Sequence, residues 1–283
     1  MPALPGTGRV TVVTNGNAFA AHALAPLLHA AGEGLELQVI VTTGLRKQGG
    51  NRGGEAWRLL RRWGPRYFAY KASTYLIPTL AEIMGRGPRT VLSLCRKLGI
   101  PTQVTRNVNH IDTRRRIEAF APDVILSVSC PYRIKPRVLS LARLGCLNLH
   151  SSLLPAYAGV CTYIHVLAAG EQRTGITLHE MVEEFDAGRI VAQQPLDIRP
   201  GVSVCELFEE LCLLAGPMVH RNVLGILERQ LLEGREQPAD GRHYCGEPSR
   251  GDISNLREHG FALMRVSDIL ALWNQQPGGV NSS

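Results

Sequence analysis

Short apolar runs rich in β-branched residues alternate with helical patterns along the first half of this chain. Residues 9–14 and 35–42 are two such runs, and residues 18–31 between them are rich in alanine and leucine. A further helical pattern at 114–120 leads into the mostly apolar run 123–128. Strands that alternate with helices in this way pair in parallel through right-handed crossovers. The alternation therefore predicts an α/β fold built on a mostly parallel sheet.

The first apolar run ends at Asn15-Gly16-Asn17, immediately before the alanine-rich pattern. A turn at a helix N-terminus can present backbone N–H groups to an anion. A tight strand-to-helix turn explains the same residues, so both interpretations stay open. The segment is neither a GxGxxG nor a Walker A motif, since no Lys-Ser/Thr follows the glycine.

The composition is that of an ordinary globular protein with a basic balance. The 283 residues are 45% hydrophobic and carry a net charge of +7, which suits an anionic substrate or a nucleic acid without selecting between them. None of the seven cysteines belongs to a Cys-x-x-Cys pair, which favours reduced thiols in the cytoplasm. The N-terminus lacks a signal-peptide pattern, and no apolar stretch reaches about 18 residues, so we expect no membrane span.

Residues 43–88 interrupt the alternation. The stretch 46–54 is glycine-rich and basic and predicts a loop, whereas the aromatic and basic residues of 57–70 have helical spacing. Three interpretations compete: a helical insertion whose arginines meet solvent, a lid or acceptor-recognition element, and a surface for an anionic membrane or nucleic acid. We favour the first, because charged helix faces usually meet only water.

Helices predominate in the rest of the chain. A helix at 91–98 is stopped by Gly99, amphipathic patterns at 204–214 and 218–232 predict two further helices, and a last helix lies near 267–273.

A polar pair marks the candidate site. Residues 147–150 resemble a short strand, so Asn148 and His150 share one face of it. Asp186 follows in a turn-like Phe-Asp-Ala-Gly segment, from which a loop can bring its carboxylate to the imidazole. An amide, an imidazole and a carboxylate suit proton transfer and oxyanion stabilisation. His179 and Asp186 do not have metal-ligand spacing, and no Gly-x-Ser-x-Gly elbow accompanies the serines at 151 and 152, so we expect neither a metal site nor a serine hydrolase.

Several of these elements recur together in a known family. The pattern Asn-x-His-x-Ser-Leu-Leu-Pro-x-Tyr-x-Gly at 148–159, then Gly-Glu at 170–171, Thr-Gly-Ile-Thr-Leu-His at 174–179 and Asp-x-Gly at 186–188 resembles the 10-formyltetrahydrofolate-dependent formyltransferases. These include glycinamide ribonucleotide, methionyl-tRNA and sugar-amine formyltransferases. The resemblance covers most of residues 9–200.

The resemblance implies a fold, a reaction and the residues that perform it. The fold is a Rossmann-like formyltransferase domain with helices on both faces of the sheet, and the donor is 10-formyltetrahydrofolate. Asn148, His150 and Asp186 match the catalytic triplet. The residues implied in folate binding form two segments, Cys130, Pro131, Tyr132, Arg133 and Ile134, and Val182, Glu183, Glu184 and Phe185. The residues implied on the acceptor side are Asn15, Gly16, Asn17, Tyr157 and Gly159.

The acceptor is left open by departures from the family pattern. Ser151 stands where Pro is usual, and Ala158 where many members have Arg. We divide the chain into a catalytic domain at 9–235, with the insertion 43–88, and an extension at 236–283 that is too short for the C-terminal barrel of the tRNA enzymes. We therefore favour a small-molecule amine, such as an amino sugar or another specialised-metabolite amine, and disfavour nucleic acid. Glycinamide ribonucleotide or tRNA formylation, hydrolysis of formyltetrahydrofolate and a non-catalytic binding module are the alternatives, and a homodimer is left open.

Overall fold

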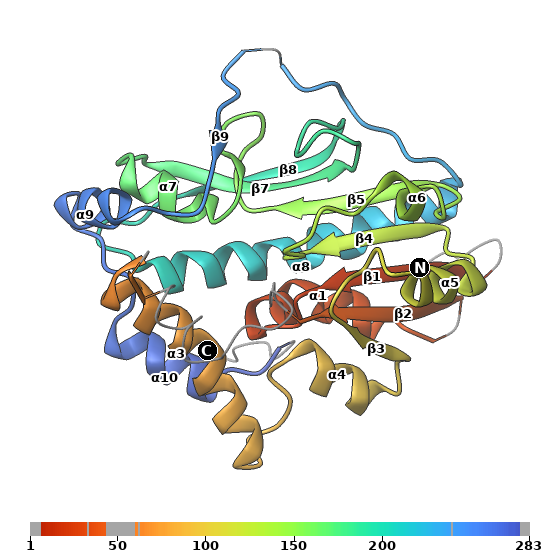
Figure 1. Ribbon diagram of the computed structural model, residues 1–283, viewed down its shortest axis with the longest axis horizontal. Coiled ribbons are helices and arrows are strands. Elements are labelled where there is room, and N and C mark those ends of the chain that lie inside the picture. Colours follow the sequence, from red (N-terminus) through yellow and green to blue (C-terminus); the bar gives the residue numbers. More distant parts are fainter. Residues whose placement is uncertain (1–6, 33, 44–59, 62, 239, 278–283) are drawn as a thin grey trace.

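A seven-stranded sheet forms the centre of the protein in the computed structural model, which describes residues 7–32, 34–43, 60–61, 63–238 and 240–277. The strand order is β3-β2-β1-β4-β5-β7-β8 (Figure 1). In chain order the strands are β1 Gly8–Thr14, β2 Leu35–Thr42, β3 Thr102–Thr105, β4 Val124–Val128, β5 Gly145–His150, β7 Arg173–Glu180 and β8 Ile190–Asp197. Strands β1 to β5 pair in parallel, and β7 and β8 add an antiparallel edge. The predicted mostly parallel α/β sheet is confirmed.

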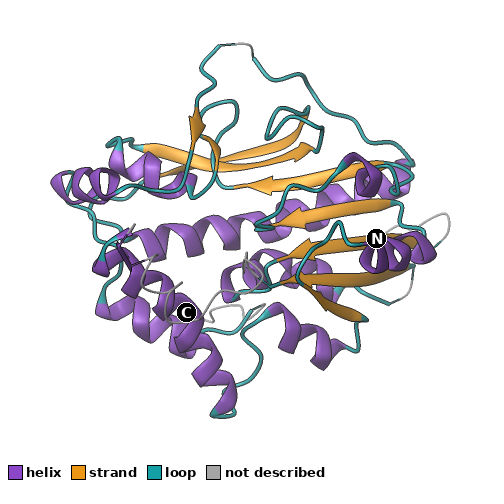
Figure 2. Cartoon of the chain, viewed as in Figure 1, coloured by secondary structure: helices purple, strands orange, loops and turns teal. Residues whose placement is uncertain are grey.

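Helices cover both faces of this sheet (Figure 2). They are α1 Ala18–His29, α3 Pro65–Ile83, α4 Val91–Leu98, α5 Ile111–Phe120, α6 Pro136–Leu139, α7 Thr162–Ala168, α8 Val204–Arg229, α9 Arg250–Glu258 and α10 Val266–Asn274. Apolar side chains of α1, α4, α7 and α8 fill the larger core, and those of α5 and α6 fill a smaller one. Because β1, β2 and β4 are covered on both sides, their sequences are nearly continuous apolar runs.

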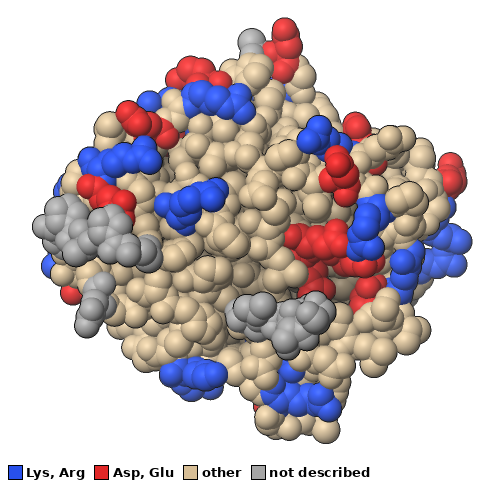
Figure 3. All heavy atoms as spheres, turned by 180° about the vertical axis from the view of Figure 1, so that it is seen from behind, with Lys and Arg blue, Asp and Glu red and all other residues tan. Residues whose placement is uncertain are grey.

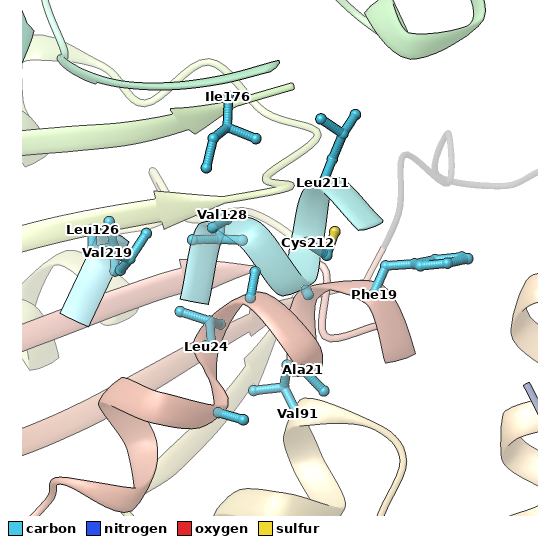
Figure 4. Packing of buried hydrophobic residues seen from close by; sticks show 14 of the residues in the cluster. Phe19, Ala21, Leu24, Val91, Leu126, Val128, Ile176, Leu211, Cys212 and Val219 are labelled. Carbon is cyan, nitrogen blue, oxygen red and sulfur yellow. The ribbon is translucent and has the colours of Figure 1, made fainter. Parts of the chain in front are cut away.

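The larger core depends on a close contact between α1 and α8 (Figure 4). Gly216 permits this approach, because a Cβ there would lie only 2.9 Å from Cγ of Pro26. The structure also corrects one sequence prediction. Residues 204–214 and 218–232 are not two helices; α8 runs unbroken through Pro217, which loses one backbone hydrogen bond while the apolar packing on both sides holds the helix together.

The remaining helices fall near their predicted places. Helix α4 matches 91–98, and Gly99 ends it in the left-handed conformation; α10 extends the prediction near 267–273 by one residue at each end. Within the insertion 43–88, α3 is helical as predicted, with buried Tyr67 and Tyr70 against the core. The predicted loop at 46–54 lies outside the described residues.

Residues 236–277 return to the main body rather than standing apart. The short strand β9 Tyr244–Cys245 pairs with β6 Ala158–Gly159, α9 packs on α7 and α10 packs on α3. The last part of the chain therefore contributes to the edges of the site described below.

Charges of both signs are interspersed over the face shown in Figure 3. Described arginines such as Arg189 and Arg199 lie beside glutamates, at 2.8 Å from Glu180 and Glu206 respectively. The net positive charge is thus partly neutralised locally rather than gathered on this face.

Candidate active site

The candidate site lies at the carboxyl end of β5, where parallel sheets commonly bind ligands. Asn148 and His150 both belong to β5. The antiparallel pairing with β7 places His179 directly opposite Asn148 and Thr177 opposite His150. Two rigid strands therefore present an amide and two imidazoles to one region.

The orientation of His150 is fixed by the backbone of the following loop. Its Nε2 lies 2.8 Å from the carbonyl oxygen of Tyr157, so Nε2–H donates and Nδ1 carries the lone pair in the neutral ring. Burial lowers the pKa of His150 below its usual value, although the Asp186 carboxylate and the Tyr157 carbonyl both favour the protonated ring. At neutral pH His150 is therefore an uncharged base whose reactive atom is Nδ1.

Asp186 completes the constellation from a separate loop. Its Oδ2 accepts a hydrogen bond from the Gly159 N–H at 2.8 Å and lies 3.8 Å from Nδ1 of His150. Burial by itself raises the pKa of this carboxyl, but the His179 and His150 rings and the Gly159 N–H together hold the pKa of Asp186 below its ordinary value. The side chain is therefore a buried, ionised carboxylate that can stabilise a proton on His150.

The Asp186 loop is held in place by residues far along the chain. Gln237 donates to the carbonyl oxygens of both Asp186 and Gly188 at 2.8 Å, and Arg242 donates to that of Phe185 at 2.7 Å. Asp186 itself has a φ of 51°, a left-handed conformation that costs energy unless the surroundings enforce it.

Positive φ values also occur at other residues of the site. Six described residues other than glycine have them, and two of these, Tyr157 and Asp186, contact His150. Unusual backbone conformations of this kind gather where side chains must be aimed.

His179 links the amide to the carboxylate. Its Nδ1 lies 2.8 Å from the carbonyl oxygen of Glu180, and its Nε2 lies 3.1 Å from the Asn148 amide nitrogen. The same Nε2 lies 3.5 Å from Oδ1 of Asp186. An amide nitrogen has two hydrogens, so Asn148 keeps one N–H to offer to a developing oxyanion.

The two segments predicted to bind the donor lie against each other. Arg133 donates to the carbonyl of Glu183 at 2.7 Å, and its guanidinium lies 5.5 Å from the centre of the Phe185 ring. Tyr132 donates from its hydroxyl to the carbonyl of Thr43 at 2.8 Å. The remaining members of these segments are Cys130, Pro131, Ile134, Val182 and Glu184, of which Glu184 pairs with Arg242 at 3.0 Å.

The residues predicted on the acceptor side fall in two places. In the turn after β1, the N–H groups of Gly16 and Asn17 donate to the side chains of Thr14 and Asn15 at 3.1 Å, and Asn17 caps α1. The geometry fits the tight-turn interpretation, since these two N–H groups already have partners.

Tyr157 and Gly159 lie closer to the catalytic residues. The Tyr157 hydroxyl donates to Glu171 at 2.7 Å, while its carbonyl holds His150. A Cβ on Gly159 would lie 2.1 Å from the carbonyl oxygen of Cys245, so only glycine allows β6 to pair with β9 here while its N–H reaches Asp186.

Comparison with known proteins identifies the family. Residues 90–214 match the family model described as formyl transferase. Over this region the chain is similar to the formyl transferases, which agrees with the family suspected from the sequence motif. A formyl transferase domain indicates an enzyme. Asn148, His150, His179 and Asp186 all lie inside the matched region.

Solved structures share the formyltransferase fold. An N-formyltransferase from Helicobacter canadensis, crystallised with folinic acid and dTDP-3-aminofucose, is 15% identical, with a TM-score of 0.57 over 89% of this chain and 80% of that one. Glycinamide ribonucleotide transformylase 1 from Symbiobacterium toebii is 17% identical, with a TM-score of 0.57 over 82% and 93%. Phosphoribosylglycinamide formyltransferase from Anaplasma phagocytophilum is 18% identical, with a TM-score of 0.56 over 84% and 97%.

Two further observations concern the described part of the chain. Within the described ranges, no group of three or more His, Cys, Asp and Glu side chains is placed to bind a metal ion. Among the helices that the structure describes, none has the length and apolarity needed to cross a membrane.

Sequence reasoning missed three contributors to the site. His179 belongs to the recognised motif and its spacing excludes a metal site, but the sequence assigns it no role, because its inward position follows from a strand register that the sequence does not reveal. Gln237 and the Tyr157 carbonyl act through main-chain contacts, which leave no side-chain motif. The Gly of the Asp-x-Gly pattern at 186–188 was the one available signal that the main chain is closely packed there. A Cβ on Gly188 would lie 2.0 Å from the Glu180 carbonyl oxygen.

Proposed function

We propose that this formyltransferase moves a formyl group from 10-formyltetrahydrofolate to the amine of a small-molecule acceptor, with Asn148, His150 and Asp186 as the catalytic residues. The observation that carries the proposal is the neutral His150, whose Nδ1 faces the ionised Asp186 at 3.8 Å. A buried base beside a carboxylate can take a proton from an attacking amine and stabilise the cation that results.

The reaction then has three balanced steps. The acceptor nitrogen forms a bond to the formyl carbon, and the carbonyl oxygen becomes an oxyanion. This oxyanion accepts a hydrogen bond from the remaining N–H of Asn148. Nδ1 of His150 takes a proton from the attacking nitrogen, and the charge of Asp186 stabilises the imidazolium. The oxyanion then re-forms the C=O bond as the bond between the formyl carbon and the folate nitrogen breaks, and the proton on His150 passes to that nitrogen, which leaves His150 neutral again.

Support for the donor comes from the two predicted segments and from similar structures. Arg133 joins the segments 130–134 and 182–185 beside Asp186, so a ligand held between them would reach the catalytic carboxylate. The Helicobacter canadensis enzyme was crystallised with folinic acid, and WlaRD, a sugar 3N-formyl transferase with a TM-score of 0.54, with 5-N-formyl-THF. These are folates of the class that the proposal requires.

An amino sugar or a related amine ranks first as the acceptor. Several similar structures are sugar N-formyltransferases. Helix α3 of the insertion also reaches the loop beside the site, where Tyr67 and Lys71 approach Sγ of Cys161 at 3.5 and 3.7 Å. Glycinamide ribonucleotide is the second candidate, because transformylases for it share the fold over most of this chain.

The test is an incubation with 10-formyltetrahydrofolate and a panel of amines, namely nucleotide-linked amino sugars, free amino sugars and glycinamide ribonucleotide. Folate release is followed by absorbance and the product by mass. Formylation of an amino sugar that disappears in His150→Ala supports the proposal, and formylation of glycinamide ribonucleotide alone overturns its acceptor. Formate release without any acceptor indicates hydrolysis, and salt-sensitive binding to anionic polymers without turnover indicates a binding module.

A further inference from the structure

Helices α3 and α10 pack against each other, and each exposes apolar side chains to solvent. On α3 the exposed residues follow a helical stripe, and on α10 they recur at spacings of three and four. This α3–α10 face consists of Tyr75, Leu76, Leu80, Ile83, Met84, Val266, Ile269 and Leu270, each between 41% and 75% exposed. The opposite side of α3 is buried through Tyr67, Tyr70, Thr74 and Ala81. Helix α3 is therefore packed firmly on the protein, and its exposed apolar stripe is a second apolar side.

Both charged residues of these two segments turn away from the face. Between residues 75 and 84 the only charged residue is Glu82, which accepts hydrogen bonds from the Arg89 and Thr90 N–H groups at 2.5 and 2.6 Å. Between 266 and 274 the only charged residue is Asp268, which is buried and accepts from the Ser203 hydroxyl at 2.6 Å. Absence of charge is the compositional mark of the core of a protein interface.

The two stripes are joined into one rigid surface at the ends of the helices. The Arg86 guanidinium lies 5.1 Å from the centre of the Trp273 ring and donates to Asn274 at 2.9 Å. Gln276 donates to the Arg86 carbonyl at 2.8 Å. A preformed surface loses little conformational entropy when a partner covers it.

The size of the face matches one side of a protein interface. If a large apolar residue exposes about 180 Å² when fully accessible, backbone included, the eight residues together expose roughly 850 Å². The largest apolar patch of a typical monomer is about 300–600 Å², and each partner of a standard interface contributes about 800 Å².

We propose that a second copy of this chain covers the α3–α10 face, in a two-fold symmetric dimer. A two-fold interface uses the same patch on both subunits, so a patch of this size supplies a complete interface without any other partner. A membrane surface is the weaker fit, because interfacial helices carry several lysines and arginines along their polar side, whereas residues 75–84 and 266–274 contain none and only Arg86 and Arg265 flank them.

The mass of the full chain in solution tests the proposal. Sedimentation from about 1 to 100 µM, a range in which a micromolar dimer dissociates, is expected to show twice the 31.0 kDa of one chain at the higher concentrations. Ile83→Glu combined with Leu270→Glu is expected to reduce the mass to that of one chain. Leu231→Glu, a change of equal charge at an exposed leucine outside the face, is the matched control and keeps the dimer.

A measurement on the unmodified protein guards against variants that misfold. Amide hydrogen exchange is expected to slow in 75–84 and 266–274 when the concentration rises, with little change in α5 on the opposite face of the sheet. A monomer at every concentration, a dimer that persists in the double variant, or dissociation by the Leu231 control as well would each overturn the proposal. Flotation of the monomer with vesicles of anionic lipid would overturn it in favour of a membrane surface.

Discussion

Nδ1 of His150 lies 3.8 Å from Oδ2 of Asp186, while Nε2 of the same ring is held by the Tyr157 carbonyl. The two nitrogens thus have separate tasks, one in positioning the ring and the other in accepting a proton. Because the ring is neutral and the carboxylate ionised, the pair is ready to receive a single proton from an acceptor.

Asp186→Asn removes the charge that stabilises a protonated His150. We expect kcat to fall by about 10²- to 10⁴-fold, the usual contribution of positioned acid–base chemistry, while the KM for the donor changes little. Steady-state kinetics measure both. Asp197→Asn, at an exposed carboxylate on β8, serves as the control and should retain wild-type kcat.

His179→Leu tests whether this ring tunes the carboxylate. His179 helps to lower the pKa of Asp186, so its loss should raise that pKa. Activity requires the ionised form and is lost as the pH falls through the pKa, so the acid limb of the kcat/KM profile should move to higher pH. His179→Gln restores a polar partner and should return part of the shift; identical profiles for all three proteins would show that His179 has only a packing role.

Gly159→Ala places a Cβ 2.1 Å from the Cys245 carbonyl oxygen at a residue with φ of 112°. We expect a loss of about 2–4 kcal/mol in the free energy of unfolding, the range of severe steric substitutions, together with lower activity because the N–H of Gly159 holds Asp186. Denaturant unfolding measures the first. Gly260→Ala, also at positive φ but with no atom within 4 Å of the added Cβ, isolates the conformational cost and should lose only about 1 kcal/mol.

Glu209→Gln should stabilise the protein at alkaline pH. Burial, and secondly the charge of Asp268, raises the pKa of Glu209 to about 7. A carboxyl with a raised pKa binds its proton more tightly in the folded protein than in the unfolded chain. The stability that this contributes to the protein is fully present below the unfolded pKa of about 4.5 and is lost as the pH rises toward 7. The amide avoids that loss. We expect a higher midpoint of thermal unfolding for the variant at pH 8 and no gain at pH 4; a gain of equal size at both would contradict this origin.

The parallel half of the sheet could be predicted from the sequence because its strands are buried on both faces. Residues 35–42 form β2 as predicted, and residues 9–14 form β1 with one added residue. The continuous apolar sequence and the neighbouring Gly residues mark both ends of such strands. Local patterns failed where distant packing decides, as in α8, whose Pro217 resembles a helix boundary but lies within one continuous helix against α1.

Of the candidate site, only the catalytic side chains could be predicted from the sequence. The shared face of Asn148 and His150 follows from the two-residue period of a strand, and the motif pointed to Asp186. The contacts of Asp186 with the N–H of Gly159 and with Gln237 depend on how β6, β9 and the last part of the chain assemble. Such contacts are non-local, and no periodicity encodes them.

The hydrogen bonds from Gln237 and Arg242 to the Asp186 loop have a consequence for how the protein becomes active during synthesis. Gln237 and Arg242 leave the ribosome about 50 residues after the carboxylate that they help to position. Until residues 237–242 are made, the Asp186 loop lacks the hydrogen bonds from Gln237 and Arg242 that hold its left-handed conformation. A nascent chain with every catalytic side chain present therefore still lacks the contacts that position Asp186, and these come from residues beyond the region matched by the family.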